Sequence, residues 1–142
     1  MMMKKIEKIT TAFIALFLFL PGLEKFTDKF SYNFATQIKM AQLPFPKLSF
    51  VVGQTSELVV GFLAIILLFF YNKMKPEIRQ RLFYFVNIMV FPIMLVALYV
   101  HAVPEVPTEV LPFEFRPPVL ALLLLLSASI NLKVHNRKEV KA

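Results

Sequence analysis

Long apolar runs separated by short polar segments make up this chain. Four stretches, at about 9–26, 49–71, 82–101 and 119–134, are long enough to cross a membrane, since a membrane helix needs roughly 20 largely apolar residues. The run IILLFF at 65–70 does not alternate polar and apolar residues, which favours a helix over a barrel strand. We therefore expect an all-α fold, with residues 1–142 forming one integral membrane domain, a four-helix transmembrane bundle.

Two of the connecting segments also carry a pattern. In the first, Phe34, Ala35, Ile38 and Ala41 recur at helical spacing, which predicts a short amphipathic helix over about 32–42 at the membrane surface. The last connection is rich in proline, and we expect it to be extended. Its prolines are Pro104, Pro107, Pro112, Pro117 and Pro118.

Composition agrees with a membrane location and narrows the function classes. The chain is 58% hydrophobic and 18% charged, whereas soluble domains average about 45–50% apolar and about 25% charged residues. This excludes a soluble enzyme and a disordered tail, and the lack of cysteine excludes a disulfide-stapled module and thiolate chemistry. The basic N-terminus resembles a signal peptide, but no small-residue cleavage site follows, so we expect the first span to be retained.

The net charge of +7 is distributed along the ends of the apolar runs. Lysine and arginine are enriched in cytoplasmic flanks, so three basic flanks on one side predict that both termini face the cytoplasm. The three flanks are Lys4, Lys5 and Lys8; Lys73, Lys75, Arg79 and Arg81; and Lys133, Arg137, Lys138 and Lys141. Because these charges do not form one basic face, we expect the lipid bilayer and no nucleic acid as a partner.

Glu57 is the ionisable residue placed deepest in an apolar run. Gly53, Gln54, Glu57 and Gly61 share one helix face, where small residues permit close helix approach and polar side chains hydrogen-bond across it. One interpretation makes Glu57 part of a proton, quinone-headgroup or substrate site. The other makes it a structural ion-pair partner or a buried neutral carboxyl, and it is favoured because no complete site chemistry accompanies Glu57.

Three cations lie on the side of the membrane to which Glu57 belongs: Lys25, His101 and Arg116. We hypothesise a Lys25–Glu57 pair, which requires the first helix to continue past Pro21 and Gly22. His101 ends the third span, where an interfacial polar cap is more common than a ligand. Asn87 is expected to hydrogen-bond between helices at the opposite, inner end.

The only two histidines, His101 and His135, fall on opposite sides of the membrane. They could not share a metal or haem within one monomer, so we expect no metal site. Redox chemistry would then require a bound quinone or the cofactor of a partner.

Short motifs in the first half of the chain resemble DoxX-type membrane proteins. The segment LPGLEKF at 20–26 is similar to the end of that family's first helix, and LPFP at 43–46 precedes a helix carrying Glu57 and Gly61. The resemblance implies a four-helix inner-membrane protein, in some members a subunit of a quinol oxidase or of a thiosulfate:quinone oxidoreductase. The matching positions are Gly22, Lys25, Glu57 and Gly61, whereas Lys8 is the nearest basic residue to the family's usual arginine.

Three hypotheses about function remain open. The first is an accessory subunit of a quinone-linked membrane redox system, with no catalytic activity of its own, acting with redox-complex subunits or as a homo-oligomer. The second is a small-solute carrier that binds its solute at Glu57. The third is a structural or assembly protein in which the polar residues hold the bundle together.

Overall fold

The structure of the protein is a computed structural model that describes residues 3–139, and side chains as far as residue 136. Within this range the chain is all-helical, as predicted. The helices are α1 (Lys5–Glu24), α2 (Asp28–Met40), α3 (Pro46–Phe70), α4 (Pro76–Ala102) and α5 (Val119–Glu139), with two 3-10 turns, η1 (Thr108–Val110) and η2 (Pro112–Glu114). By length and composition, α1, α3, α4 and α5 are each able to cross a membrane.

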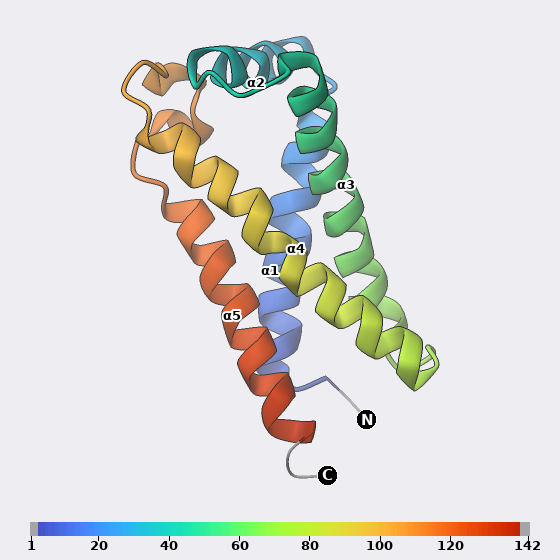
Figure 1. Cartoon of the computed structure of the whole chain (residues 1–142). Coiled ribbons are helices and arrows are strands. Elements are labelled where there is room, and N and C mark those ends of the chain that lie inside the picture. The colour runs from blue at the N-terminus through green and yellow to red at the C-terminus, as the bar shows by residue number, and fades with distance from the viewer. Residues whose placement is uncertain (1–2, 140–142) are drawn as a thin grey trace.

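The four long helices stand side by side, and α2 lies across one end of them (Figure 1). We call this the α2 end, and it also holds η1 and η2. The other end, the terminal end, holds the start of α1, the end of α5 and the α3–α4 connection (Figure 1). The start of α1 and the end of α5 therefore lie at the same end of the bundle, as four crossings require. That this end faces the cytoplasm stays a prediction. Of the basic residues used to predict it, the side chains of Arg137 and Lys138, and all of Lys141, lie outside the described part.

Each spanning helix extends past at least one end of the apolar run from which it was predicted, whereas α1 and α3 end one or two residues before the predicted C-terminal bound. α3 and α4 begin at Pro46 and Pro76, where the missing proline N–H costs nothing because first-turn N–H groups have no helical partner. α2 begins at Asp28, several residues earlier than expected, and α5 begins directly after Pro118. Hydropathy locates the membrane-facing part of a helix, but the hydrogen-bonded ladder continues into its polar flanks.

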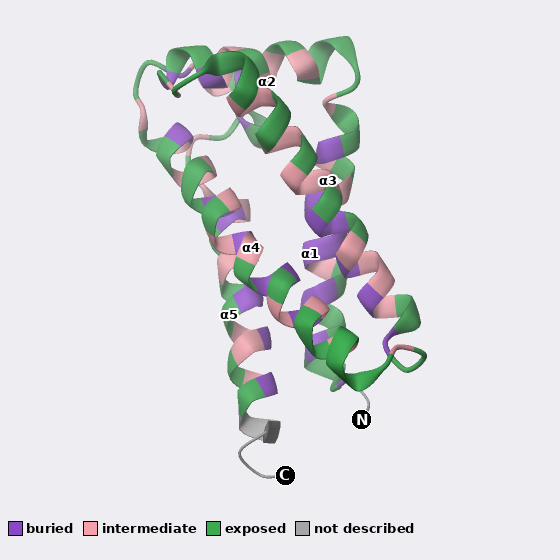
Figure 2. Cartoon of the chain, turned by 45° about the vertical axis from the view of Figure 1, so that its right-hand side comes forward, coloured by how far each residue is buried: buried purple, intermediate pink, exposed green. Residues whose placement is uncertain are grey.

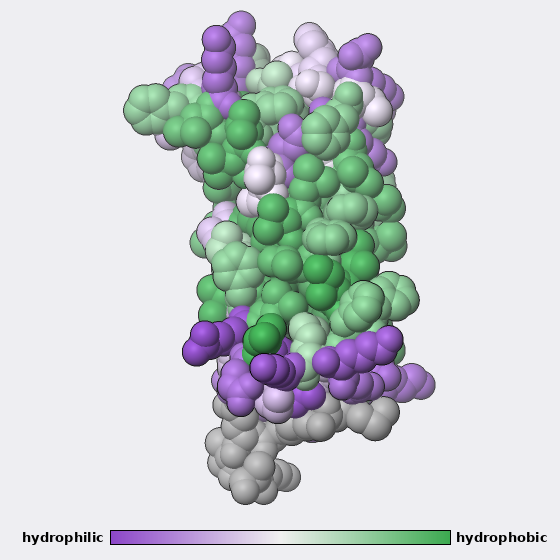
Figure 3. Space-filling view, turned by 90° about the vertical axis from the view of Figure 1, so that its right-hand side faces the viewer, coloured by the Kyte–Doolittle hydropathy of each residue, from purple (hydrophilic) through white to green (hydrophobic). Residues whose placement is uncertain are grey.

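The outer surface of the bundle is apolar over its middle. Large side chains that point outward include Leu16, Phe62, Leu95 and Leu122, each half exposed or more. In Figure 3 an apolar band separates hydrophilic residues above and below it. Buried residues face inward between the helices, as Figure 2 shows. This arrangement is typical of a bundle whose solvent is lipid.

The prediction of an extended last connection is wrong. Val106, Val110 and Leu111 are buried against Ala41 and Val100 in a small apolar cluster at the α2 end. Gln37 on α2 also donates a hydrogen bond to the Val110 carbonyl. The segment folds into the two 3-10 turns because burying these apolar side chains outweighs the extended preference of proline-rich chain.

Candidate functional site

An ion pair joins α1 to α3 near the α2 end. The Lys25 Nζ donates to Glu57 Oε2, and only 11% and 16% of the two side chains are exposed. Lys25 reaches this position because α1 continues through Pro21, with the Lys25 N–H bonded to the Pro21 carbonyl. The contact hypothesised from sequence is therefore present, and its geometric condition is met.

Phe34, on α2, covers the same ammonium group. The Lys25 Nζ lies 4.2 Å from the centroid of the Phe34 ring, a cation–π contact. Helix α2 thereby closes the pair from the end of the bundle, and three helices meet at one lysine.

The three glycines all lie where a second element comes close. A Cβ added to Gly61 would sit 2.5 Å from the Phe19 backbone nitrogen, so α1 and α3 touch backbone to backbone there. A Cβ on Gly22 would meet Leu58 at 2.9 Å, and one on Gly53 would meet the Phe34 ring at 2.7 Å. The glycines thus permit the close crossing that brings Lys25 to Glu57.

Gln54 lies on the same helix, one turn before Glu57. Its Nε2 is buried and has no hydrogen-bond partner among the described residues. The expected hydrogen bond from this amide across the helix crossing is therefore not formed by Nε2.

His101 and Arg116 form a second group, in which Arg116 caps α4. The Arg116 guanidinium donates to the carbonyls of His101 at 3.2 Å, of Val103 at 3.0 Å and of Val106. The His101 Nδ1 lies 2.7 Å from the Arg116 carbonyl. Arg116 therefore binds the C-terminal end of α4, where free carbonyls and the helix dipole attract a cation, and His101 contacts the Arg116 backbone.

His101 also lines an apolar pocket of about 460 Å³. Its walls come from α1, from α5 and from the connection between α4 and α5. The other lining residues are Phe13, Phe17, Pro112, Phe113, Phe115, Pro117, Val119, Leu120 and Leu123. The volume is in the usual range for small-molecule sites, about 300–1,000 Å³, and none of these other side chains is polar.

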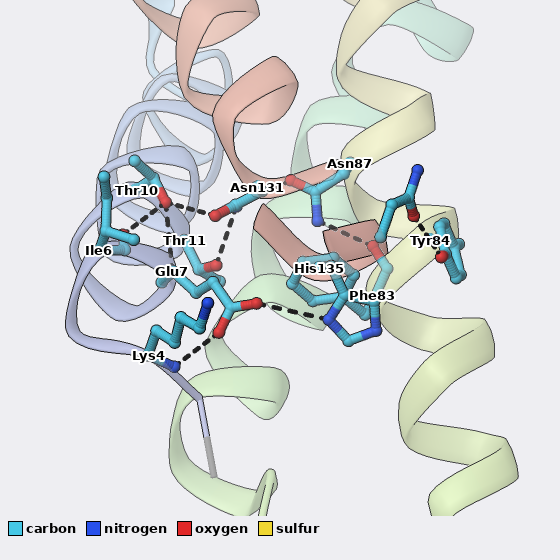
Figure 4. A network of polar contacts seen from close by, with 11 residues as sticks. Lys4, Ile6, Glu7, Thr10, Thr11, Phe83, Tyr84, Asn87, Asn131 and His135 are labelled. Atoms are coloured by element: carbon cyan, nitrogen blue, oxygen red, sulfur yellow. Dashed lines mark hydrogen bonds and ion pairs between the residues drawn. The ribbon is translucent and has the colours of Figure 1, made fainter. Parts of the chain in front are cut away.

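A third group, at the terminal end, is a buried polar network that the sequence analysis missed except for Asn87 (Figure 4). Asn131 on α5 is fully buried and lies at its centre. Its Nδ2 donates to Asn87 Oδ1 at 2.8 Å and to Thr11 Oγ1 at 3.1 Å, and its Oδ1 accepts from Thr10. The predicted interhelical role of Asn87 is confirmed, since one amide links α4 to α5.

The same end joins the first and last helices through Glu7 and His135. The Glu7 carboxylate accepts from the Lys4 N–H at 2.6 Å, and His135 Nδ1 lies 3.4 Å from Glu7 Oε1. The His135 ring stacks on Phe83, with centroids 4.2 Å apart (Figure 4). A sequence signal for this network existed: Ser127, Asn131 and His135 recur every four residues, so one face of α5 is polar.

Among the side chains that the structure describes, no three histidine or acidic residues gather as metal ligands. Comparisons of the chain with models of protein families, with curated proteins and with solved structures found no match.

Proposed function

We propose that this integral membrane protein is an accessory subunit of a quinone-linked membrane redox system, and that the quinone occupies the pocket beside His101. The observation that carries the proposal is the pocket itself, which combines apolar walls with one polar side chain. A quinone likewise combines a polar part with an apolar part, because its ring bears two oxygens and its isoprenoid tail is apolar.

The position of the pocket suits a ligand that arrives from the bilayer. Leu120 and Leu123 belong to the spanning helix α5, and Phe13 and Phe17 belong to α1. The ring would lie beside His101 at the α2 end, and the tail would run along α1 and α5 toward lipid. Resemblance to DoxX-type proteins at Lys25 and Glu57 also favours this class. In the proposal, that ion pair holds the end of α1 against α3.

The decisive experiment is to purify the protein in mild detergent and to identify bound lipids by mass spectrometry. We expect quinone in stoichiometric amount with the wild type, and a several-fold lower amount with His101→Phe. The matched control is Phe69→Leu, at a 75% exposed position on α3 outside the pocket. Wild-type protein without quinone, together with unchanged electron transfer in a deletion strain, would refute the proposal.

The terminal-end network favours a second candidate, a structural or assembly protein. Asn131 on α5 bonds to Asn87 on α4 and to Thr11 on α1, so this buried amide links three helices of the bundle. In this case Glu57→Gln would lower thermal stability yet leave cellular function intact. The carrier hypothesis predicts instead that Glu57→Gln abolishes transport, because the solute would bind at Glu57.

A further inference from the structure

We infer that the connection between α3 and α4 binds an anionic phospholipid of the surrounding bilayer, whose phosphate is held by Lys73, Lys75 and Arg79. The connection lies at the terminal end of the bundle, whereas the pocket beside His101 extends toward the α2 end, so this site is independent of the proposed quinone. It combines excess positive charge, unoccupied hydrogen-bond donors and exposed apolar side chains.

Basic residues are dense in this connection and in the start of α4. Four of the nine residues from 73 to 81 are basic, namely Lys73, Lys75, Arg79 and Arg81, and Glu77 is the only acidic one. None of the four basic side chains takes part in an ion pair with another described residue. A phosphodiester carries one negative charge and would supply the missing partner.

Aromatic rings hold two of these cations in place. The Arg79 guanidinium lies over the Tyr71 ring, 4.8 Å from its centroid, and the Lys73 Nζ lies 5.6 Å from the centroid of Phe70. Because Tyr71 is buried, Arg79 is held against the junction of α3 and α4. Neither cationic group makes a hydrogen bond within the described residues, so the N–H donors of both remain available to phosphate oxygens.

Apolar side chains are exposed beside the cations. Phe69, Phe70 and Ile78 point away from the core, and each is about half exposed or more. Figure 3 views the bundle from the side on which the connection lies, and hydrophilic residues border the apolar band there. A phospholipid would thus place its phosphate beside the cations and its acyl chains against Phe69 and Ile78, whereas a free phosphate ion would use only the cations.

Two lipids with the same acyl chains test the charge requirement: palmitoyl-oleoyl phosphatidylglycerol and palmitoyl-oleoyl phosphatidylcholine. Both contain the phosphate, but the choline ammonium makes the second lipid zwitterionic. Each lipid is titrated into the full-length protein in mild-detergent micelles, and binding is measured by native mass spectrometry. We expect the wild type to bind phosphatidylglycerol about tenfold more tightly, because each basic residue near the membrane surface adds attraction for an anionic lipid.

Two variants connect this preference to the named residues. The triple variant Lys73→Gln, Lys75→Gln and Arg79→Gln should bind the two lipids with nearly equal affinity. The double variant Lys73→Gln with Lys75→Gln keeps the contact of Arg79 with Tyr71, so it tests the site with that packing intact. It should bind phosphatidylglycerol several-fold more weakly than the wild type does.

The matched control removes the same amount of charge from the α2 end. Lys29→Gln, Lys39→Gln and Lys47→Gln change three exposed lysines, and this variant should keep the wild-type preference. Glycerophosphoglycerol, the headgroup without acyl chains, should not displace phosphatidylglycerol from the wild type even in large excess.

Four results would each overturn the proposed lipid site. They are equal affinity of the wild type for the two lipids, an undiminished preference in the triple variant at the α3–α4 connection, equal losses in both triple variants, and displacement by glycerophosphoglycerol. Equal losses would mean that net charge alone attracts the lipid. Displacement would mean that the site binds a phosphate group from solution and not a membrane lipid.

Discussion

Lys25 and Glu57 show how a costly pair of residues is accommodated in an apolar bundle. Each charge has its partner, and Phe34 covers the ammonium group, so little of either side chain is exposed. Removing one partner leaves the other charge desolvated and unpaired, which is more damaging than removing both. The pair is therefore expected to act as a unit.

A double-mutant cycle measures that coupling. Lys25→Ala and Glu57→Ala should each destabilise the protein, and the double variant should be more stable than the sum of the two effects by about 1–3 kcal/mol. The measurement is unfolding by a denaturing detergent titrated into mild-detergent micelles. Lys29→Ala, at an exposed position on α2, is the control. Strict additivity would show that the ion pair contributes no interaction energy.

Asn131 supports a second prediction about single side chains. Asn131→Leu removes the partner of Asn87, Thr10 and Thr11 at a fully buried position, so we expect a loss of about 1–3 kcal/mol in stability. The double variant Asn87→Leu with Asn131→Leu should lose less than the sum of the single effects, because fewer polar groups are left unpaired. Thermal unfolding followed by circular dichroism measures both.

The matched control for this pair is Ser129→Ala, an exposed position on α5 whose hydroxyl bonds only within its own helix. Its melting temperature should equal that of the wild type. If Asn131→Leu left the melting temperature unchanged as well, the network would not stabilise the terminal end.

Among the helices, the crossing of α1 and α3 is the closest contact that the glycines reveal. Gly61 meets backbone atoms of Phe19, which cannot rotate away, while Gly53 meets only the ring of Phe34. The two helices must therefore separate if a side chain is added at Gly61. At Gly53 the flexible ring absorbs part of the change.

Alanine substitutions along α3 test this crossing. Gly61→Ala should destabilise the bundle by about 1–3 kcal/mol, the usual cost of overpacking, and Gly53→Ala should cost less. Thr55→Ala, at an exposed position between them, is the control and should be nearly neutral. Detergent-induced unfolding measures the series. A Gly61→Ala variant as stable as the control would mean that α1 and α3 do not approach this closely.

The charges at the two ends of the bundle predict its orientation in the membrane. The terminal end is mainly basic, whereas the opposite end, which α2 covers (Figure 1), carries basic and acidic residues in similar number. We propose that the terminal end is cytoplasmic, because lysine and arginine in short flanks are retained on that side. The pocket beside His101 would then open toward the outer leaflet.

Labelling of single cysteines tests the orientation, and the natural chain has no cysteine that would interfere. In intact spheroplasts, a membrane-impermeant maleimide should label Lys39→Cys on α2. It should label Lys73→Cys, in the α3–α4 connection, only after permeabilisation. Leu95→Cys, on the apolar outer face of α4, is the control and should stay unlabelled in both conditions. The opposite pattern would invert the proposed topology.

The pattern of residues along the chain is sufficient to predict an all-α membrane protein, its four spanning helices and the contact between Lys25 and Glu57. Apolar runs of this length have few alternatives in a membrane, since the backbone must satisfy its own hydrogen bonds there. The ion pair could also be predicted, because the four-residue spacing of Gly53, Glu57 and Gly61 and the position of Lys25 after Gly22 are local features. These predictions needed only helix geometry and the cost of burying charge.

Other features depend on which helices become neighbours. Thr10 and Asn131 are 121 residues apart, and no pattern in the sequence around either residue predicts that they are in contact. Arg116 lies in sequence before α5, yet it binds carbonyls at the end of α4, and His101 lies beside α1 and α5 in one pocket. Packing of the apolar faces determines how the helices of the bundle are arranged. The buried polar groups then form hydrogen bonds with the side chains that this arrangement places beside them.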